Sequence, residues 1–261
     1  MATDTILYAW ARPLEIDPKL DHTWVTDYQP ASTYADIQAV VKAYKNYWFC
    51  WGTFHTDDAR AIGNEGADAS AAKCLVCPND PNSHGTIFRY AIDGVCHQLA
   101  NQVLYSTPSR LVVSQAHGYR ISSFLYGAYG LKHADWAQKI DTCMVSKAEL
   151  MDDFEDTLIQ VLGARATPDT VEALKNLRAE FQASVQDMRR QSFADTSEDT
   201  AAVLNDKITH IMQEARKILG DDTFTAVFET EIADTFKLVD PDMFAASEDN
   251  YAESLKSKSD D

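Results

Sequence analysis

The sequence predicts an α+β fold: an N-terminal domain with a mixed or antiparallel sheet, followed by an all-helical extension. Short segments rich in β-branched and aromatic residues alternate with turns before residue 145, whereas apolar residues recur at helical intervals after it. All five Cys and all five Trp also precede residue 145. We therefore expect an α+β domain over 1–145 that carries the chemistry, a helical extension over 146–246 and a polar tail over 247–261.

The N-terminal domain is expected to contain several short strands and two helices. The expected strands cover 5–12, 22–28, 46–55, 86–92 and 109–117, and the expected helices cover 34–44 and 95–104. Residues 118–130 are expected to be part strand and part loop. Residues 56–85 show almost no periodicity, so they predict an unusually long loop that is either mobile or held by a clip at Cys74 and Cys77.

The extension is expected to contain three long helices and one shorter apolar segment. A capping box at Ser146 and Glu149 opens the first helix, Pro168 opens the second, and the third ends before Gly220. The shorter segment lies around 224–228, and the polar tail is expected to be frayed. The apolar stripes are too wide for isolated helices, so we expect them to pack against each other and against the first domain or a second copy.

Charge and hydropathy exclude several classes of function. The net charge is −17, of which −14 falls in residues 146–261, and such a surface repels the phosphate backbone of nucleic acids. The sequence has no apolar run of about 18 residues, so we expect no membrane span. The N-terminus does not resemble a signal peptide, and the odd number of Cys does not suggest a secreted disulfide framework. We therefore expect a cytoplasmic protein.

Cys96 is the strongest candidate for a reactive group. It follows Gly94 closely and begins an amphipathic helix. At a helix N-terminus the dipole and the unpaired backbone N–H groups stabilise a thiolate and can bind an oxyanion. We expect Cys96 to be the most reactive thiol, with a pKa below the ordinary value of about 8.5. The alternative is a small buried residue that packs the start of the helix.

Four histidines are candidates for the base that a Cys nucleophile needs. His22 opens a strand, His55 ends the aromatic strand, and His117 closes the strand that returns from the Cys96 helix. His97 adjoins Cys96 but projects about 100° away around the helix, so we expect it to be a poor partner. Each histidine could instead serve only as a structural hydrogen-bonding group.

The order of these residues resembles the permuted papain-like cysteine hydrolases, a group that includes the lecithin:retinol acyltransferase-like enzymes. The similarity runs through His22, His55 and Cys96 and covers residues 5–118. The chain reads Val-Cys-His-Gln at Cys96, where the family usually has Asn before the Cys and Glu-His after it. The resemblance implies a papain-like helix with Cys96 as the acylated nucleophile, His22 as the general base and His55 as the group that orients it. His117 is a reserve base.

Cys74 and Cys77 form a Cys-X-X-Cys pair with three open interpretations. Such a pair is half of many structural zinc sites, and Cys96 and His97 could complete a tetrahedral set. The pair could instead be a redox pair or disulfide that pins the long loop, or two free thiols.

Two functions from different classes follow. The favoured one is a cofactor-free cysteine hydrolase or acyltransferase that acts on an amide, ester or thioester of a small molecule or peptide. The rival is a non-catalytic binding module, with zinc at Cys74 and Cys77, presented on an acidic helical bundle. In either case the C-terminal helices are expected to dimerise, cover the site or dock a protein partner.

Overall fold

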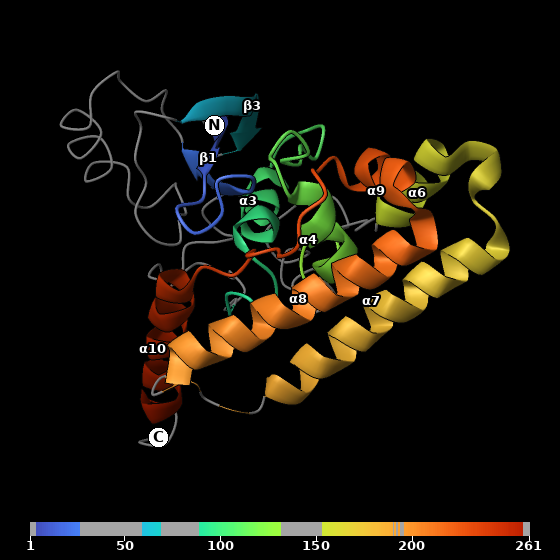
Figure 1. The fold of residues 1–261 in the computed structure, drawn as a ribbon. Helices are drawn as coiled ribbons and strands as arrows, with labels where there is room; N and C mark the ends of the chain where they lie inside the picture. The colour runs from blue at the N-terminus through green and yellow to red at the C-terminus, as the bar shows by residue number, and fades with distance from the viewer. Residues whose placement is uncertain are drawn as a thin grey trace.

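The computed structural model describes residues 4–26, 59–68, 89–131, 153–189, 191, 193 and 196–257. This part of the chain is α+β, as predicted, with a small antiparallel sheet and seven α-helices (Figure 1). The elements expected over 34–44 and 46–55 lie outside the described residues, as do His55, Cys74 and Cys77.

The sheet has three strands in the order β2-β1-β3, and both neighbouring pairs are antiparallel. β1 (Asp4–Pro13) and β2 (Asp21–Thr26) confirm two of the predicted strands. Pro13 has no backbone N–H to donate, and β1 ends there. The indole Nε1 of Trp10 donates a hydrogen bond to Thr26 Oγ1 at 2.9 Å, which joins the two strands through their side chains.

β3 (Arg60–Asp68) lies inside the segment that was expected to be a structureless loop, so that expectation is wrong for these residues. Gly63 and Gly66 interrupt the alternation of side chains that would have indicated a strand. Antiparallel pairing with β1 supplies the order instead. Gly63 also has a packing role, because a Cβ atom there would lie 2.9 Å from a methyl group of Leu111.

Two buried helices follow the sheet. α3 (Cys96–Leu104) confirms the predicted helix. α4 (Tyr119–Tyr126) occupies a segment that was expected to be part strand and part loop, and that expectation is wrong. Gly118 at φ 82° precedes α4 and Gly127 at φ 75° follows it, so the two glycines supply left-handed backbone at the helix ends rather than strand or loop structure.

Two other expected strands are also wrong over the described residues. Residues 109–117 form turns, and the N–H of Val113 is satisfied by Asn101 Oδ1 of α3 at 2.8 Å rather than by a neighbouring strand. Residues 89–92 enter a tight turn that the bridge between Tyr90 and Gly94 closes. In both segments tertiary contacts override the β propensity of the local sequence.

The C-terminal part is helical, as predicted. It contains α6 (Asp153–Leu162), the short 3-10 helix η1 (Gly163–Arg165), α7 (Pro168–Met188), α8 (Ser197–Leu219), α9 (Asp221–Phe228) and α10 (Pro241–Ser257). α7 and α8 are the longest and lie side by side (Figure 1). Thr167 caps α7, since its Oγ1 accepts a hydrogen bond from Thr170 N at 3.2 Å.

The expectation of a frayed tail from residue 247 is wrong for the described residues. α10 continues to Ser257, and Ser247 and Glu248, at the start of the supposed tail, are both buried. The polar sequence misled because these two side chains bind partners elsewhere in the fold rather than water.

A buried hydrophobic core joins residues from both parts of the chain. Phe124 of α4 packs against Phe154 of α6 and Phe228 of α9, with ring centroids 4.7 and 5.5 Å apart. α7 also packs against α4. The C-terminal helices therefore pack against each other and against the first part, as predicted. The boundary near residue 145 lies outside the described residues and stays a prediction.

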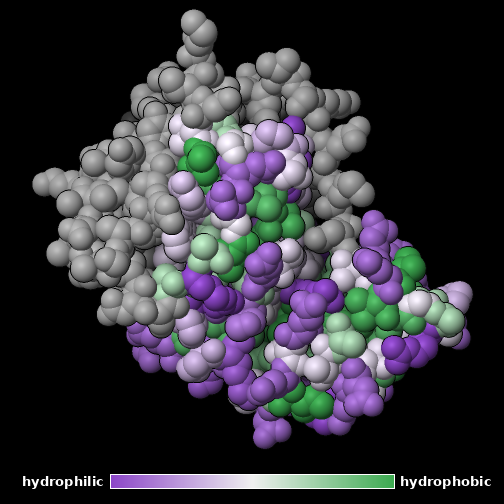
Figure 2. Space-filling view, turned by 90° about the horizontal axis from the view of Figure 1, so that it is seen from above, coloured by the Kyte–Doolittle hydropathy of each residue, from purple (hydrophilic) through white to green (hydrophobic). Residues whose placement is uncertain are grey.

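The described surface carries its hydrophobic residues in separate groups between hydrophilic ones (Figure 2). The large hydrophobic residues that are exposed in the described ranges are spread over several segments: Ile6 in β1, Ile159 in α6, Val203 and Ile218 in α8, and Ile232 between α9 and α10. Within the described ranges, no helix is both long and apolar enough to cross a membrane.

Candidate functional site

Cys96 is the first residue of α3, as the sequence predicts. Gln98 stabilises this helix start, because its Oε1 accepts a hydrogen bond from Val95 N at 3.0 Å. Cys96 is 4 % exposed, and its Sγ lies 3.8 Å from the carbonyl oxygen of Asp21. Asp21 begins β2, against which α3 packs. The fold therefore brings the thiol to the strand that carries His22.

Burial raises the pKa of the Cys96 thiol to about 11. The polar groups of Thr23 and the backbone of His97 lower this pKa, and the charge of Asp21 raises it further. The expectation of a pKa below the ordinary value is therefore wrong in direction: loss of hydration outweighs the favourable helix terminus. Cys96 is a neutral thiol at neutral pH, so nucleophilic attack would require a base that takes its proton as the bond forms.

His22 is fully buried in β2. It pairs across the sheet with Arg12 and stacks on Trp24 with ring centroids 5.6 Å apart. Burial lowers the pKa of His22 to about 3, and electrostatic interactions with Arg12 and His97 also lower it. At neutral pH the imidazole is uncharged and one ring nitrogen has a lone pair, but the low pKa makes this nitrogen a weaker proton acceptor than that of an ordinary histidine.

His97 is a buried part of the same region, although the sequence predicts a poor partner for Cys96. Its Nδ1 lies 2.8 Å from Ser122 Oγ on α4. That hydroxyl donates to Tyr119 O and accepts from Gln98 Nε2, so its single proton is already used and His97 Nδ1 is the donor. Burial lowers the pKa of His97 to about 4, while Asp21 raises it. His97 therefore also stays neutral and links α3 to α4.

A signal for His97 exists in the sequence. α3 has a polar face opposite its apolar one, and the four polar residues on that face are all buried: His97, Gln98, Asn101 and Gln102. A helix with such a composition and no exposed face needs internal hydrogen-bond partners for each polar group. Periodicity alone identifies only its apolar stripe.

Asp21 is a site residue that sequence reasoning missed. It is fully buried, and its carboxylate forms a two-point ion pair with Arg60 at the start of β3, with Arg60 Nη1 at 3.0 Å from Oδ1. It also accepts a hydrogen bond from the backbone N of His117 at 2.6 Å. The Asp21 carboxylate therefore anchors the start of β2, while its carbonyl oxygen faces the thiol.

His117, the reserve base, lies beside the Asp21 carboxylate, with 3.6 Å between His117 Nδ1 and Asp21 Oδ2. Its side chain is 62 % exposed, whereas Cys96 is buried. The role of His117 as a base stays a prediction, as does the orienting role of His55.

The metal interpretation is not decided by the described residues. No group of three or more His, Cys, Asp or Glu side chains in these ranges could hold a metal ion. Cys74 and Cys77, on which that interpretation depends, lie outside them.

Comparison with protein-family models, with curated proteins and with solved structures finds no match to this chain. The resemblance to papain-like hydrolases therefore remains a similarity in the order of His22, His55 and Cys96 along the sequence. The inference of function rests on the region formed by Asp21, His22, Thr23, Cys96 and His97, which is called the Cys96 site below.

Proposed function

We propose that this protein is a cysteine-nucleophile hydrolase or acyltransferase that acts on an amide, ester or thioester, with Cys96 as the nucleophile and His22 as the general base. One observation carries the proposal: the thiol at the N-terminus of α3 lies 3.8 Å from the backbone of β2 at Asp21, the residue before His22. Acyl transfer by a thiol requires a base on a neighbouring element, and His22 is the neutral imidazole that follows Asp21 in β2.

The reaction would proceed from the neutral pair. The imidazole of His22 takes the thiol proton while Sγ bonds to the substrate carbonyl carbon, and negative charge develops on the carbonyl oxygen. Backbone N–H groups of the first turn of α3 would stabilise that oxyanion. The leaving group departs with the proton from the imidazolium, and a thioester remains on Cys96. Water or another acceptor then attacks the thioester, which regenerates the thiol and releases the acyl product.

The substrate would be a small molecule or a peptide, and we place the reaction in the cytoplasm. The proposal needs no cofactor. The rival function, a zinc-clipped binding module, uses Cys96 and His97 as ligands instead, and the two functions make opposite predictions about the thiol.

Acylation by p-nitrophenyl acetate tests the proposal. We expect a burst of p-nitrophenol and an acetyl group on Cys96, identified by peptide mass spectrometry. Cys96→Ser should abolish the burst, whereas the control Cys143→Ser should retain it. His22→Gln should slow acylation by about 10²–10⁴-fold, because the proton loses its acceptor. The exposed His210 offers a matched control, and His210→Gln should leave the rate unchanged.

Metal analysis of the same preparation separates the rival. Acetylation of Cys143 or Cys50 in preference to Cys96 would overturn the assignment of the nucleophile. Stoichiometric zinc that is lost in Cys74→Ser and Cys77→Ser, together with no acetylated thiol, would establish the binding module.

A further inference from the structure

The last helix of the chain, α10, contacts the turn formed by residues 89–95, which leads directly into Cys96. We infer that Ser247 and Glu248 of α10 are positioning residues of the Cys96 site, because they hold this turn in the conformation from which α3 begins. The catalytic meaning of this inference rests on the proposed function, whereas the placement of the thiol can be measured without it.

The central contact is an ion pair between Arg89 and Glu248. Arg89 Nε lies 3.0 Å from Glu248 Oε1, and Arg89 Nη2 lies 2.6 Å from Oε2. The two side chains are only 2 % and 0 % exposed. Two parallel hydrogen bonds fix both the distance and the orientation of the planar groups, so the pair sets a defined geometry rather than a loose attraction.

The same pair binds the segment between α7 and α8. Arg89 Nη1 donates to Arg189 O at 2.9 Å, and Nη2 donates to Gln191 O at 3.0 Å. Glu248 Oε2 also accepts a hydrogen bond from Phe193 N at 3.0 Å. One guanidinium and one carboxylate therefore join three segments that are far apart in the sequence.

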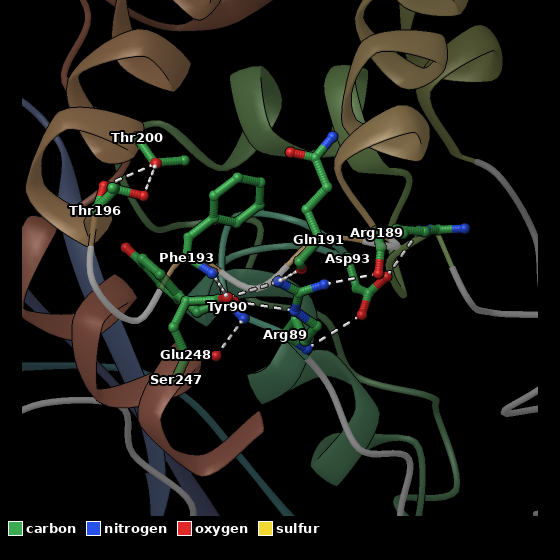
Figure 3. Close-up of polar contacts among 10 residues, drawn as sticks. All are labelled: Arg89, Tyr90, Asp93, Arg189, Gln191, Phe193, Thr196, Thr200, Ser247 and Glu248. Carbon is green, nitrogen blue, oxygen red and sulfur yellow. Dashed lines mark hydrogen bonds and ion pairs between the residues drawn. The ribbon is translucent and has the colours of Figure 1, made fainter. Parts of the chain in front are cut away.

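Further contacts hold the backbone of the turn. Tyr90 N donates to Ser247 Oγ at 2.9 Å. Asp93 accepts a hydrogen bond from Arg89 N at 3.1 Å, and its other carboxylate oxygen lies 3.0 Å from Arg189 Nε. Figure 3 shows Arg89 between Glu248 on one side and Asp93 on the other. The C-terminal part thus supplies partners on both sides of the turn.

The turn itself has an unfavourable backbone conformation. Ala91, a buried non-glycine residue, has φ 62°, and its N donates to Gly94 O at 2.7 Å. Such a conformation persists only where surrounding contacts determine it. Cys96 follows Gly94 by two residues, so a change in the turn would move the start of α3 and the thiol with it.

Stability alone does not explain the ion pair. Removing two charges from water is energetically costly, and well-packed apolar residues often replace a buried pair without loss of stability. An arginine and a glutamate at these positions therefore point to a requirement for geometry. The element that needs this geometry is the turn that presents Cys96.

Glu248→Gln in the full-length protein tests the inference, because it keeps the shape of the side chain and removes its charge. Alkylation of Cys96 by iodoacetamide under native conditions, followed by mass spectrometry, reports local opening around the thiol. The loss of global stability in Glu248→Gln, measured by urea denaturation, predicts a certain increase in the alkylation rate of Cys96. We expect the observed rate to exceed that predicted rate by at least about tenfold. Acetylation by p-nitrophenyl acetate should fall in the same variant.

Phe244→Ala is the matched control, since Phe244 lies in the same helix and is fully buried but is outside the ion pair. In Phe244→Ala the alkylation rate of Cys96 should rise only by the amount that the loss of global stability predicts. A double variant, Arg89→Met with Glu248→Leu, removes the pair without leaving a buried charge, so it keeps a test available if Glu248→Gln does not fold. The double variant leaves Arg189 O, Gln191 O and Phe193 N without these partners, so it should lose some global stability, and the alkylation of Cys96 should still rise by more than that loss accounts for.

The inference is overturned if alkylation in Glu248→Gln and in the double variant follows global stability alone, or if Phe244→Ala shows the same excess. Failure of the proposed function is a separate result. If Cys96→Ser keeps the p-nitrophenol burst, Cys96 is not the nucleophile, but its alkylation still reports whether α10 positions the turn.

Discussion

The Cys96 site and the helices α7 and α8 bury different kinds of side chain. β2 and α3 bury groups that can change charge, namely Asp21, His22, Cys96 and His97. The buried residues of α7 and α8 are apolar apart from Thr200. Burial of apolar surface stabilises a fold, whereas burial of ionisable groups opposes it unless each group is paired or neutral. Under the proposed function, the first region would carry the chemistry and the second would support it.

α10 connects the two regions. Its apolar residues Met243 and Phe244 belong to the same core as α7 and α8, while Ser247 and Glu248 bind the turn before Cys96. A helical extension with this arrangement is part of the unit that holds the site.

Phe181→Ala in α7 should have the largest effect on stability. Phe181 is fully buried and packs edge-to-face on Tyr126, with centroids 5.1 Å apart. Truncation of a buried Phe costs about 3–5 kcal/mol of unfolding free energy, measured by urea denaturation. If the two regions have separate roles, the acetylation rate of the folded variant should stay at the wild-type value. A tenfold lower acetylation rate in the folded variant would contradict this separation of roles.

The second prediction concerns pH. The pKa values of His22 and His97 are about 3 and about 4 in the folded protein, against 6.5 for an ordinary histidine. Below pH 6.5 the unfolded chain binds protons that the folded chain does not, so the stabilisation is complete above that pH and is lost as the pH falls to about 4 for His97 and to about 3 for His22. Between pH 7 and pH 5, each histidine should lower the unfolding free energy by about 2 kcal/mol.

Variants at three histidines test the origin of that loss. His22→Gln should remove about half of the pH dependence, and His97→Gln should remove a similar share. His210→Gln should leave it unchanged, because His210 is exposed on α8. Denaturation curves of the three variants at pH 7 and pH 5 provide the measurement. If the unfolding free energy falls by the same amount between pH 7 and pH 5 in the wild type and in His22→Gln, His22 is not a buried neutral imidazole.

The difference between the Cys96 site and the helices α7 and α8 also explains which features the sequence predicts. The helical regularity of α7, α8 and α9 follows from apolar spacing and from local end signals such as Pro168 and Gly220. These elements are stabilised by one apolar face, which is visible in the sequence. β1, β2 and α3 are also predictable, and with them the positions of His22 and Cys96 at element starts.

The rest of the site depends on contacts between distant segments. The partner of Asp21 is Arg60, and the partner of Arg89 is Glu248, which lies in the supposed polar tail. No local pattern encodes such pairs. The pKa of Cys96 is a further example, because the sequence shows the helix terminus but not the degree of burial that dominates it.

The third prediction changes the charge beside the thiol. Asp21→Asn removes the partner of Arg60, which is partly exposed and can be rehydrated, so we expect a stability loss of about 1.5–3 kcal/mol. Because the charge of Asp21 raises the pKa of Cys96, the variant should also lower that pKa. Alkylation rates of Cys96 across a pH series measure the shift. Asp206→Asn, at an exposed position in the middle of α8, is the control and should change neither quantity measurably.

The smallest expected effect is at an exposed ion pair of the supporting region. Lys175 Nζ of α7 lies 2.9 Å from Glu155 Oε1 of α6, and the two side chains are 49 % and 46 % exposed. Water solvates both charges, and long side chains lose freedom when they pair, so Lys175→Gln should cost less than about 1 kcal/mol and less still at high salt. Urea denaturation at low and high ionic strength measures this. A larger, salt-independent loss would mean that the helical region also depends on charge geometry, and its contrast with the Arg89–Glu248 pair would disappear.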